Sequence, residues 1–117
     1  MIILKSLQEI EKMQRACLVV ADALDAIRSM VRPGISTEEL DNEAERIIRK
    51  AGAIPAFKGY RGYPKTLCTS LNSEVIHGIP AQDVVLKQGD LLSIDVGAIV
   101  EGFYGDAAVT LAVGEVT

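Results

Sequence analysis

The sequence has little of what many metal-binding and secreted modules rely on. It contains no tryptophan, one histidine and two cysteines, Cys17 and Cys68, which do not form a Cys-x-x-Cys motif. This argues against a zinc-ribbon site or a disulfide framework. Two unpaired thiols indicate a reducing, cytoplasmic location. With a single histidine, any metal site inside one copy of the chain has to be built mainly from carboxylates.

Other absences narrow the class of partner. No apolar run approaches the ~18 residues of a membrane span, and the net charge of −4 argues against a nucleic-acid partner, which usually requires a basic patch. Neither a Gly-x-Ser-x-Gly elbow nor a glycine-rich phosphate loop is present. What remains is a chain of 117 residues, 49% apolar and 24% charged, which fits one ordinary globular domain.

Two capping boxes predict where helices begin. Ser6-Leu7-Gln8-Glu9 and Ser36-Thr37-Glu38-Glu39 each combine a serine with a glutamate three residues later. The first helix is predicted to end at about Met30 and the second at about Ala51, just before Gly52. Apolar residues spaced by three and four predict one buried stripe on the first helix. These residues are Ile10, Met13, Cys17, Val20, Leu24 and Ile27.

After Gly52 the pattern changes to extended segments separated by turns. The segments predicted as strands, the first of them leading into a loop, are 53–63, 66–71, 75–77, 91–100 and 103–113. Turns are predicted at Gly78-Ile79-Pro80 and at Glu101-Gly102. Two helices followed by several strands indicate an α+β fold, or half of a larger α/β fold.

A pair of aspartates inside the two long strands is the strongest chemical signal. If Glu101-Gly102 is a two-residue hairpin loop, residue 95 faces residue 108, and Asp95 and Asp106 are diagonal neighbours roughly 7–8 Å apart. Two like charges on a half-buried face are costly, and divalent ions would offset that cost. A three-residue loop would instead put the aspartates on opposite faces. The alternative role for each carboxylate is to accept backbone hydrogen bonds or to face water.

The remaining candidates are ambiguous on sequence alone. His77 precedes a turn, where a lone histidine is more often packed or solvated than catalytic. Phe57, Tyr60, Tyr63 and Cys68 could line a small apolar pocket, although such residues belong to a core by default.

Short motifs nevertheless extend over the whole chain in a fixed order. They are Glu9-Ile10-Glu11-Lys12-Met13, Pro33-Gly34-Ile35-Ser36-Thr37, Glu39-Leu40-Asp41, Gly59-Tyr60-Arg61-Gly62-Tyr63-Pro64-Lys65, Ser70-Leu71-Asn72, His77-Gly78-Ile79-Pro80, Gly89-Asp90, Ile94-Asp95-Val96 and Gly102-Phe103-Tyr104-Gly105-Asp106. In this order, and without a detectable gap, they resemble the bacterial type I methionine aminopeptidases.

The resemblance implies a fold and an activity. The family has the pita-bread fold, in which a pseudo-twofold relates two α/β halves. Residues 1–117 would form the amino-terminal half-domain, with two helices packed on a mainly antiparallel sheet that ends in a long hairpin. The implied reaction is the hydrolytic removal of initiator methionine from new proteins, with two divalent ions (manganese, iron, cobalt or zinc) and a bridging hydroxide.

The resemblance also implies roles for individual residues. Asp95 resembles the bidentate ligand of one ion, and Asp106 resembles the aspartate that bridges both. His77 resembles the histidine that contacts the substrate and helps to stabilise or protonate the reacting centre. The residues that match the pocket for the methionine side chain are Tyr60, Tyr63 and Cys68. Phe57 departs from the pattern, because bacterial members often have a cysteine there.

One departure from the family is large. A histidine and two glutamates from the second half complete the family's metal site, and these have no counterpart here, so we expect a fragment with weak or no activity of its own. The alternative is an inactive half-domain that forms a symmetric homodimer through the face its second half would cover. Two copies each of Asp95 and Asp106 would then meet in an all-oxygen site that favours manganese, magnesium or calcium over zinc. The expected substrate partner is a peptide or nascent protein with initiator methionine; no nucleic-acid or membrane partner is expected.

Overall fold

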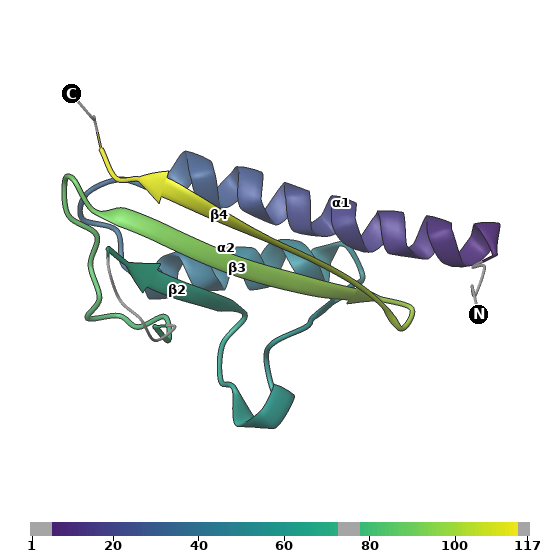
Figure 1. Ribbon diagram of the computed structural model, residues 1–117. Coiled ribbons are helices and arrows are strands. Elements are labelled where there is room, and N and C mark those ends of the chain that lie inside the picture. Colours follow the sequence, from purple (N-terminus) through teal and green to yellow (C-terminus); the bar gives the residue numbers. More distant parts are fainter. Residues whose placement is uncertain (1–5, 73–77, 115–117) are drawn as a thin grey trace.

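The computed structural model describes residues 6–72 and 78–114. Its elements, in chain order, are α1 (Leu7–Met30), α2 (Thr37–Lys50), β1 (Ile54–Pro55), the 3-10 helix η1 (Tyr60–Gly62), β2 (Leu67–Leu71), β3 (Leu91–Val100) and β4 (Phe103–Ala112). The predicted class is confirmed, since two amino-terminal helices precede an antiparallel sheet that ends in a long hairpin (Figure 1). The strand predicted at 75–77 lies outside the described residues.

Both helices begin at the predicted capping boxes. The Ser6 hydroxyl accepts the N–H of Glu9 at 3.1 Å, and the Glu9 carboxylate accepts the N–H of Ser6 at 3.2 Å. Ser36 and Glu39 repeat this exchange at 3.1 and 2.9 Å. These bonds satisfy N–H groups that the first helical turn leaves without intrahelical acceptors. Neither helix has the combination of length and apolar character that a membrane crossing by a described helix would need.

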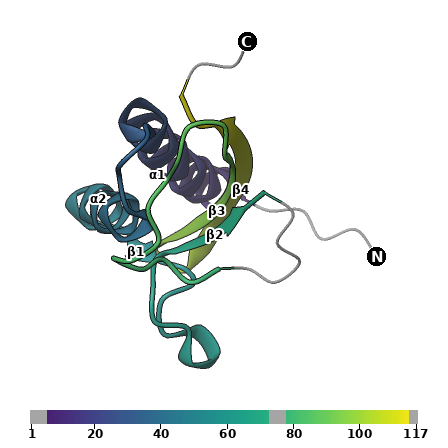
Figure 2. The ribbon, with the colours of Figure 1, turned by 90° about the vertical axis from the view of Figure 1, so that its left-hand side faces the viewer.

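The sheet is organised around β3. β4 pairs with β3 along its whole length on one edge, while β2 and β1 share the other edge, opposite residues 92–96 and 98–99. Figure 2 shows that both helices lie on one side of this sheet, and within the described residues no other element covers the opposite side. We call this opposite side the open face.

Alternation along β3 separates the core from the open face. Leu92, Ile94 and Val96 are at most 1% exposed and pack in one cluster with the helices. The helix residues in this cluster include Val20, Ile27, Leu40 and Ile48. Because neighbouring residues of a strand point to opposite sides, the odd-numbered residues of β3, Asp95 among them, point to the open face.

The buried stripe of α1 differs from the predicted one. The buried residues are Ala16, Val20, Ala23 and Ile27. The prediction was wrong for Ile10 and Cys17, whose side chains are exposed. An ideal Cβ on Gly105 of β4 would lie only 2.7 Å from the backbone nitrogen of Cys17 and 2.8 Å from the carbonyl carbon of Ala16. The prediction is confirmed for Val20 and Ile27, which are buried. Alanine side chains let α1 lie close to β4, so the buried face is marked by small residues as well as by large apolar ones.

Candidate functional site

The β3–β4 hairpin brings the two aspartates onto one face. Val100 pairs with Phe103, so the loop contains only Glu101 and Gly102, as predicted. The same register pairs Asp95 with Ala108 and Asp106 with Gly97. The two carboxylates are therefore diagonal neighbours on the open face. This placement was predicted from the turn and is confirmed, whereas the role of the aspartates as metal ligands stays a prediction.

Asp95 lies among small polar side chains. It is half-buried, and β2 places Cys68 directly opposite it. A hollow of about 330 Å³ beside it is lined by Ser70, Ser93, Ile94, Asp95, Ala108, Val109 and Thr110. The hydroxyls of Ser93 and Thr110 lie 3.0 Å apart across the β3–β4 pair. The ring of hydroxyl and carboxylate oxygens makes this part of the open face hydrophilic.

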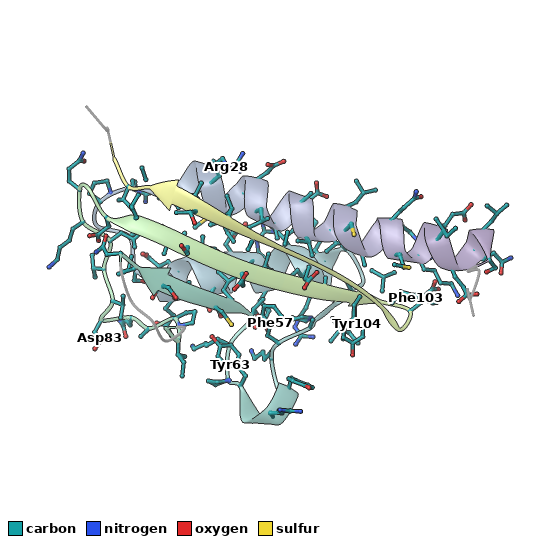
Figure 3. All side chains as sticks on the ribbon, viewed as in Figure 1. Arg28, Phe57, Tyr63, Asp83, Phe103 and Tyr104 are labelled. Carbon is teal, nitrogen blue, oxygen red and sulfur yellow. The ribbon has the colours of Figure 1, made fainter. Side chains whose placement is uncertain are left out.

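Asp106 is more exposed than Asp95. It lines a second hollow, of about 410 Å³, with Ala56, Phe57, Tyr60, Tyr104 and Gly105. Within the described residues no cation forms an ion pair with Asp106. Figure 3 shows Phe57 and Tyr104 beside each other near the base of the projecting 57–66 loop.

The donor set fits part of a divalent-metal site. Two carboxylates on one face offer the hard oxygen ligands that manganese or magnesium favours. Within residues 6–72 and 78–114, however, no group of three or more histidine, cysteine, aspartate or glutamate side chains is close enough to hold an ion. The remaining ligands of such a site therefore have to come from elsewhere.

A third hollow gathers the residues predicted to form a substrate pocket. Its volume is about 450 Å³, and its lining is Phe57, Tyr60, Arg61, Gly62, Tyr63, Pro64, Cys68 and Ile79. The tight loop that brings these side chains together has Gly59 at φ 87° and Gly62 at φ 80°, which glycine adopts without strain. The N–H of Gly59 also donates to the carbonyl of Tyr63 at 2.7 Å. Tyr60, Tyr63 and Cys68, spread over nine residues of sequence, thus line one hollow.

Tyr63 and Cys68 are coupled at the base of this hollow. The Tyr63 hydroxyl donates to the carbonyl of Leu67 at 2.6 Å. Burial, followed by the contact with Cys68, raises the pKa of Tyr63 above its usual value. Burial also raises the pKa of the Cys68 thiol, against the effect of its hydrogen bond with Tyr63, and the negative charge of Asp95 adds to the rise. Both groups are therefore protonated and uncharged at neutral pH, which suits an apolar ligand.

One residue that supports the site was not predicted from its chemistry. Asp41 of α2 is only 2% exposed, and its Oδ1 accepts the N–H groups of Thr66 and Leu67 at 2.9 and 2.7 Å. These bonds hold the start of β2, the strand that carries Cys68. The available signal was an aspartate directly after Leu40, on the apolar side of an amphipathic helix. His77, the predicted catalytic residue, lies outside the described residues.

The comparisons with known sequences all point to one family. The sequence model of metallopeptidase family M24 (Peptidase_M24) matches residues 11–117. A methionine aminopeptidase of Clostridium acetobutylicum is 50% identical over 100% of this chain and 47% of its own length. Methionine aminopeptidase 1 of Bacillus subtilis is 48% identical, with the same coverage of both chains. The chain thus spans about half the length of the curated relatives it matches.

Solved structures agree with the sequence matches. The methionine aminopeptidase of Thermotoga maritima superposes with a TM-score of 0.93 at 46% identity, over 100% of this chain and 47% of the other. The prolidase of Pyrococcus furiosus superposes with a TM-score of 0.81 at 28% identity, over 97% and 32%. These matches confirm the predicted resemblance to the amino-terminal half of bacterial type I methionine aminopeptidases. The chain therefore belongs to metallopeptidase family M24.

Proposed function

We propose that this chain supplies the amino-terminal half of a metal-dependent methionine aminopeptidase. The observation that carries the proposal is the convergence of Asp95 and Asp106 on the open face, next to a hollow lined by Tyr60, Tyr63 and Cys68. A carboxylate pair beside an uncharged side-chain pocket is what an exopeptidase needs, because the metal ligands and the first substrate residue have to lie next to each other. The remaining metal ligands would come from the second half that its relatives have.

The carboxylate pair and the apolar hollow would have different roles. Asp95 and Asp106 would hold two divalent ions, manganese, iron, cobalt or zinc, with Asp106 shared between them. When bound, such ions supply Lewis acidity that polarises a carbonyl and activates water. Tyr60, Tyr63 and Cys68 would pack around the thioether side chain, for which sulfur–aromatic contacts are favourable. His77 would contact the substrate and stabilise or protonate the reacting centre.

The proposed substrates are peptides and nascent proteins that begin with methionine, and the proposed location is the cytoplasm. The uncharged Tyr63 and Cys68 suit an apolar first residue. Nothing in the described residues favours the predicted symmetric homodimer, and the comparisons give it no support. The partner that the open face is expected to meet is the rest of a two-half metallopeptidase.

Calorimetric titration with manganese tests the role of the carboxylates. We expect the chain to bind manganese, and Asp95→Ala or Asp106→Ala to weaken that binding by roughly a hundredfold or more, because even outer-shell partners of ligands contribute ~10–100-fold. The matched control is Asp83→Asn, which removes an exposed carboxylate far from the hairpin loop (Figure 3). Equal binding by the parent and both alanine variants would refute the metal role of the pair.

Activity can be tested in a completed site. A chimaera in which residues 1–117 replace the matching 47% of the C. acetobutylicum relative should release methionine from a Met-Ala peptide. Asp106→Ala in the chimaera should lower kcat/KM by more than about a hundredfold, for the same reason as above. Turnover that survives this substitution would show that the chain's carboxylates do not serve the reaction.

A further inference from the structure

Three carboxylates of α2 face the loop that forms most of the apolar hollow. Glu38, Asp41 and Glu45 are three and four positions apart, so they share one side of the helix. The exposed fraction is 34% for the Glu38 side chain, 23% for the Glu45 side chain and only 2% for Asp41. We call these three residues the acidic ridge. None of them is part of the described lining of the hollow.

The acidic ridge holds the beginning of the 57–66 loop. Lys58 Nζ donates to Oε1 of Glu45 at 2.6 Å, and this hydrogen bond is the main reason that the pKa of Glu45 is lowered to about 2. Arg49 of α2 donates to the other oxygen, Oε2, at 3.0 Å. Glu45 therefore has one cationic partner from the loop and one from its own helix.

The same ridge holds the end of the loop. Lys65 Nζ donates to Oε1 of Glu38 at 3.4 Å, and the Thr66 hydroxyl donates to Oε1 of Glu45 at 3.0 Å. The backbone N–H of Thr66 donates to Asp41, as described above. Both ends of the loop are thus attached to one side of one helix.

The position of the loop decides the shape of the hollow. In two views at right angles, the part of the loop that contains η1 projects from the rest of the molecule (Figures 1 and 2). Tyr60 and Tyr63 line the hollow from this loop, whereas Cys68 lines it from β2, and Ile79 from a later segment of the chain. A displacement of the loop ends would therefore change the distance between these two walls.

We propose that Glu38, Asp41 and Glu45 are positioning residues for substrate binding, because the acidic ridge holds both ends of the 57–66 loop where the hollow fits the first side chain of a substrate. This inference rests on the proposed function. The ridge contacts neither the substrate nor the carboxylate pair of β3 and β4. Its effect is on the fraction of molecules in which the hollow is formed.

Hydrogen exchange of the Thr66 and Leu67 amides measures how often the loop end leaves the ridge, since both N–H groups donate to Asp41. Lys58→Met and Lys65→Met each remove one cation that the loop offers to the ridge. An exposed ion pair usually changes an equilibrium by about 1.4- to 5-fold. The two pairs share no residue, so the double variant should exchange roughly two- to thirtyfold faster.

Titration with L-methioninamide measures the consequence for binding. The chain has no tryptophan, and Tyr60 and Tyr63 line the hollow, so tyrosine fluorescence reports on it. The Kd of the double variant should rise within the same two- to thirtyfold range, because only molecules with the loop in place bind the probe. Its affinity for manganese, measured by calorimetry, should equal that of the parent, because Asp95 and Asp106 belong to the β3–β4 hairpin.

Two further variants separate positioning from a general loss of charge. Lys58→Arg keeps a cation opposite Glu45 and should restore the exchange rates and the Kd of the parent. Arg49→Met is the matched control, because it removes the partner of Glu45 that comes from α2 itself and leaves the loop contact in place. This control should have the exchange rates and the probe affinity of the parent. Circular dichroism establishes that each variant retains its helices and sheet.

The possible failures are distinguishable. Unchanged exchange of the Thr66 and Leu67 amides in the double variant would show that the ridge does not hold the loop. Faster exchange with an unchanged Kd, or with an equal loss of manganese affinity, would show that the ridge has no positioning role for the hollow. Either result refutes this inference and leaves the proposed function intact. If the parent itself does not bind L-methioninamide, the hollow is not the substrate site, and the proposed function fails together with the inference.

Discussion

Gly105→Ala is expected to lower the free energy of unfolding by about 3 kcal/mol, the upper end of the usual cost of overpacking. The added methyl carbon would lie 2.7 Å from the backbone nitrogen of Cys17 and 2.8 Å from the carbonyl carbon of Ala16. A flexible side chain could turn away from such a contact, but backbone atoms in the middle of α1 cannot. The helix and β4 would have to separate.

Urea denaturation followed by circular dichroism measures this loss as a lower midpoint. The matched control is Ala112→Val, which adds atoms at an exposed position of the same strand and should stay within about 0.5 kcal/mol of the parent. Because Gly105 also lines the hollow of Asp106, Gly105→Ala should weaken manganese binding as well. An unchanged midpoint would mean that α1 does not lie as close to β4 as described.

Replacing Asp41 should separate the loss of a hydrogen-bond acceptor from the loss of a charge. Asp41→Ala leaves the N–H groups of Thr66 and Leu67 without their acceptor in a buried place, and we expect a cost of roughly 2–6 kcal/mol, at about 1–3 kcal/mol for each group. Asp41→Asn keeps an acceptor oxygen and should cost about 1 kcal/mol or less at neutral pH. Equal midpoints for these two variants in urea denaturation would contradict the proposed role of the two hydrogen bonds.

The stability of the parent and that of Asp41→Asn should also depend differently on pH. Burial raises the pKa of Asp41 above its ordinary value of 3.8, against the effect of the two N–H donors. The folded chain therefore holds this proton more tightly than the unfolded chain. The resulting stabilisation is fully present below pH 3.8 and is lost as the pH rises through the folded pKa. As the pH rises through the folded pKa of Asp41, the free energy of unfolding of the parent should therefore fall relative to that of Asp41→Asn.

Glu45 does not obscure this comparison. A hydrogen bond from Lys58 Nζ, at 2.6 Å, is the main reason that the pKa of Glu45 is lowered to about 2. Its stabilising effect is present above the unfolded pKa of 4.5 and is lost as the pH falls towards 2, the opposite direction from Asp41. Both chains contain Glu45, so the stability that Glu45 itself loses at low pH largely cancels in the difference between them, which reports on Asp41 and on its repulsion by Glu45. A difference that does not change with pH would mean that Asp41 keeps its ordinary pKa.

The parts of the fold that depend on local chemistry could be predicted from the sequence. The capping boxes at Ser6 and Ser36 give the starts of both helices, because each box involves residues only three apart. The two-residue loop Glu101-Gly102 gives the register of the hairpin, and with it the shared face of Asp95 and Asp106. In each case the partners are close in sequence, so no knowledge of distant packing is required.

Features that depend on distant contacts could not be predicted in this way. The close approach of α1 to β4 at Ala16 and Cys17 depends on Gly105, nearly ninety residues further along the chain, and the spacing of apolar residues in α1 does not reveal it. Asp41 finds its partners in β2. The grouping of Tyr60, Tyr63 and Cys68 depends on a loop with positive φ at Gly59 and Gly62 and on the pairing of β2 with β3. The residues alone left a pocket and a core as alternatives for that group, and the family resemblance favoured the pocket.

The hairpin register also has a kinetic consequence. Asp95 and Asp106 are only eleven positions apart, in strands joined by a loop of two residues, so bringing them together costs little chain entropy. Local contacts of this kind form early in folding, before contacts between distant segments. We therefore expect the two negative charges to meet before α1 docks through Gly105, and ions that screen or bridge them should speed folding as well as stabilise the folded chain.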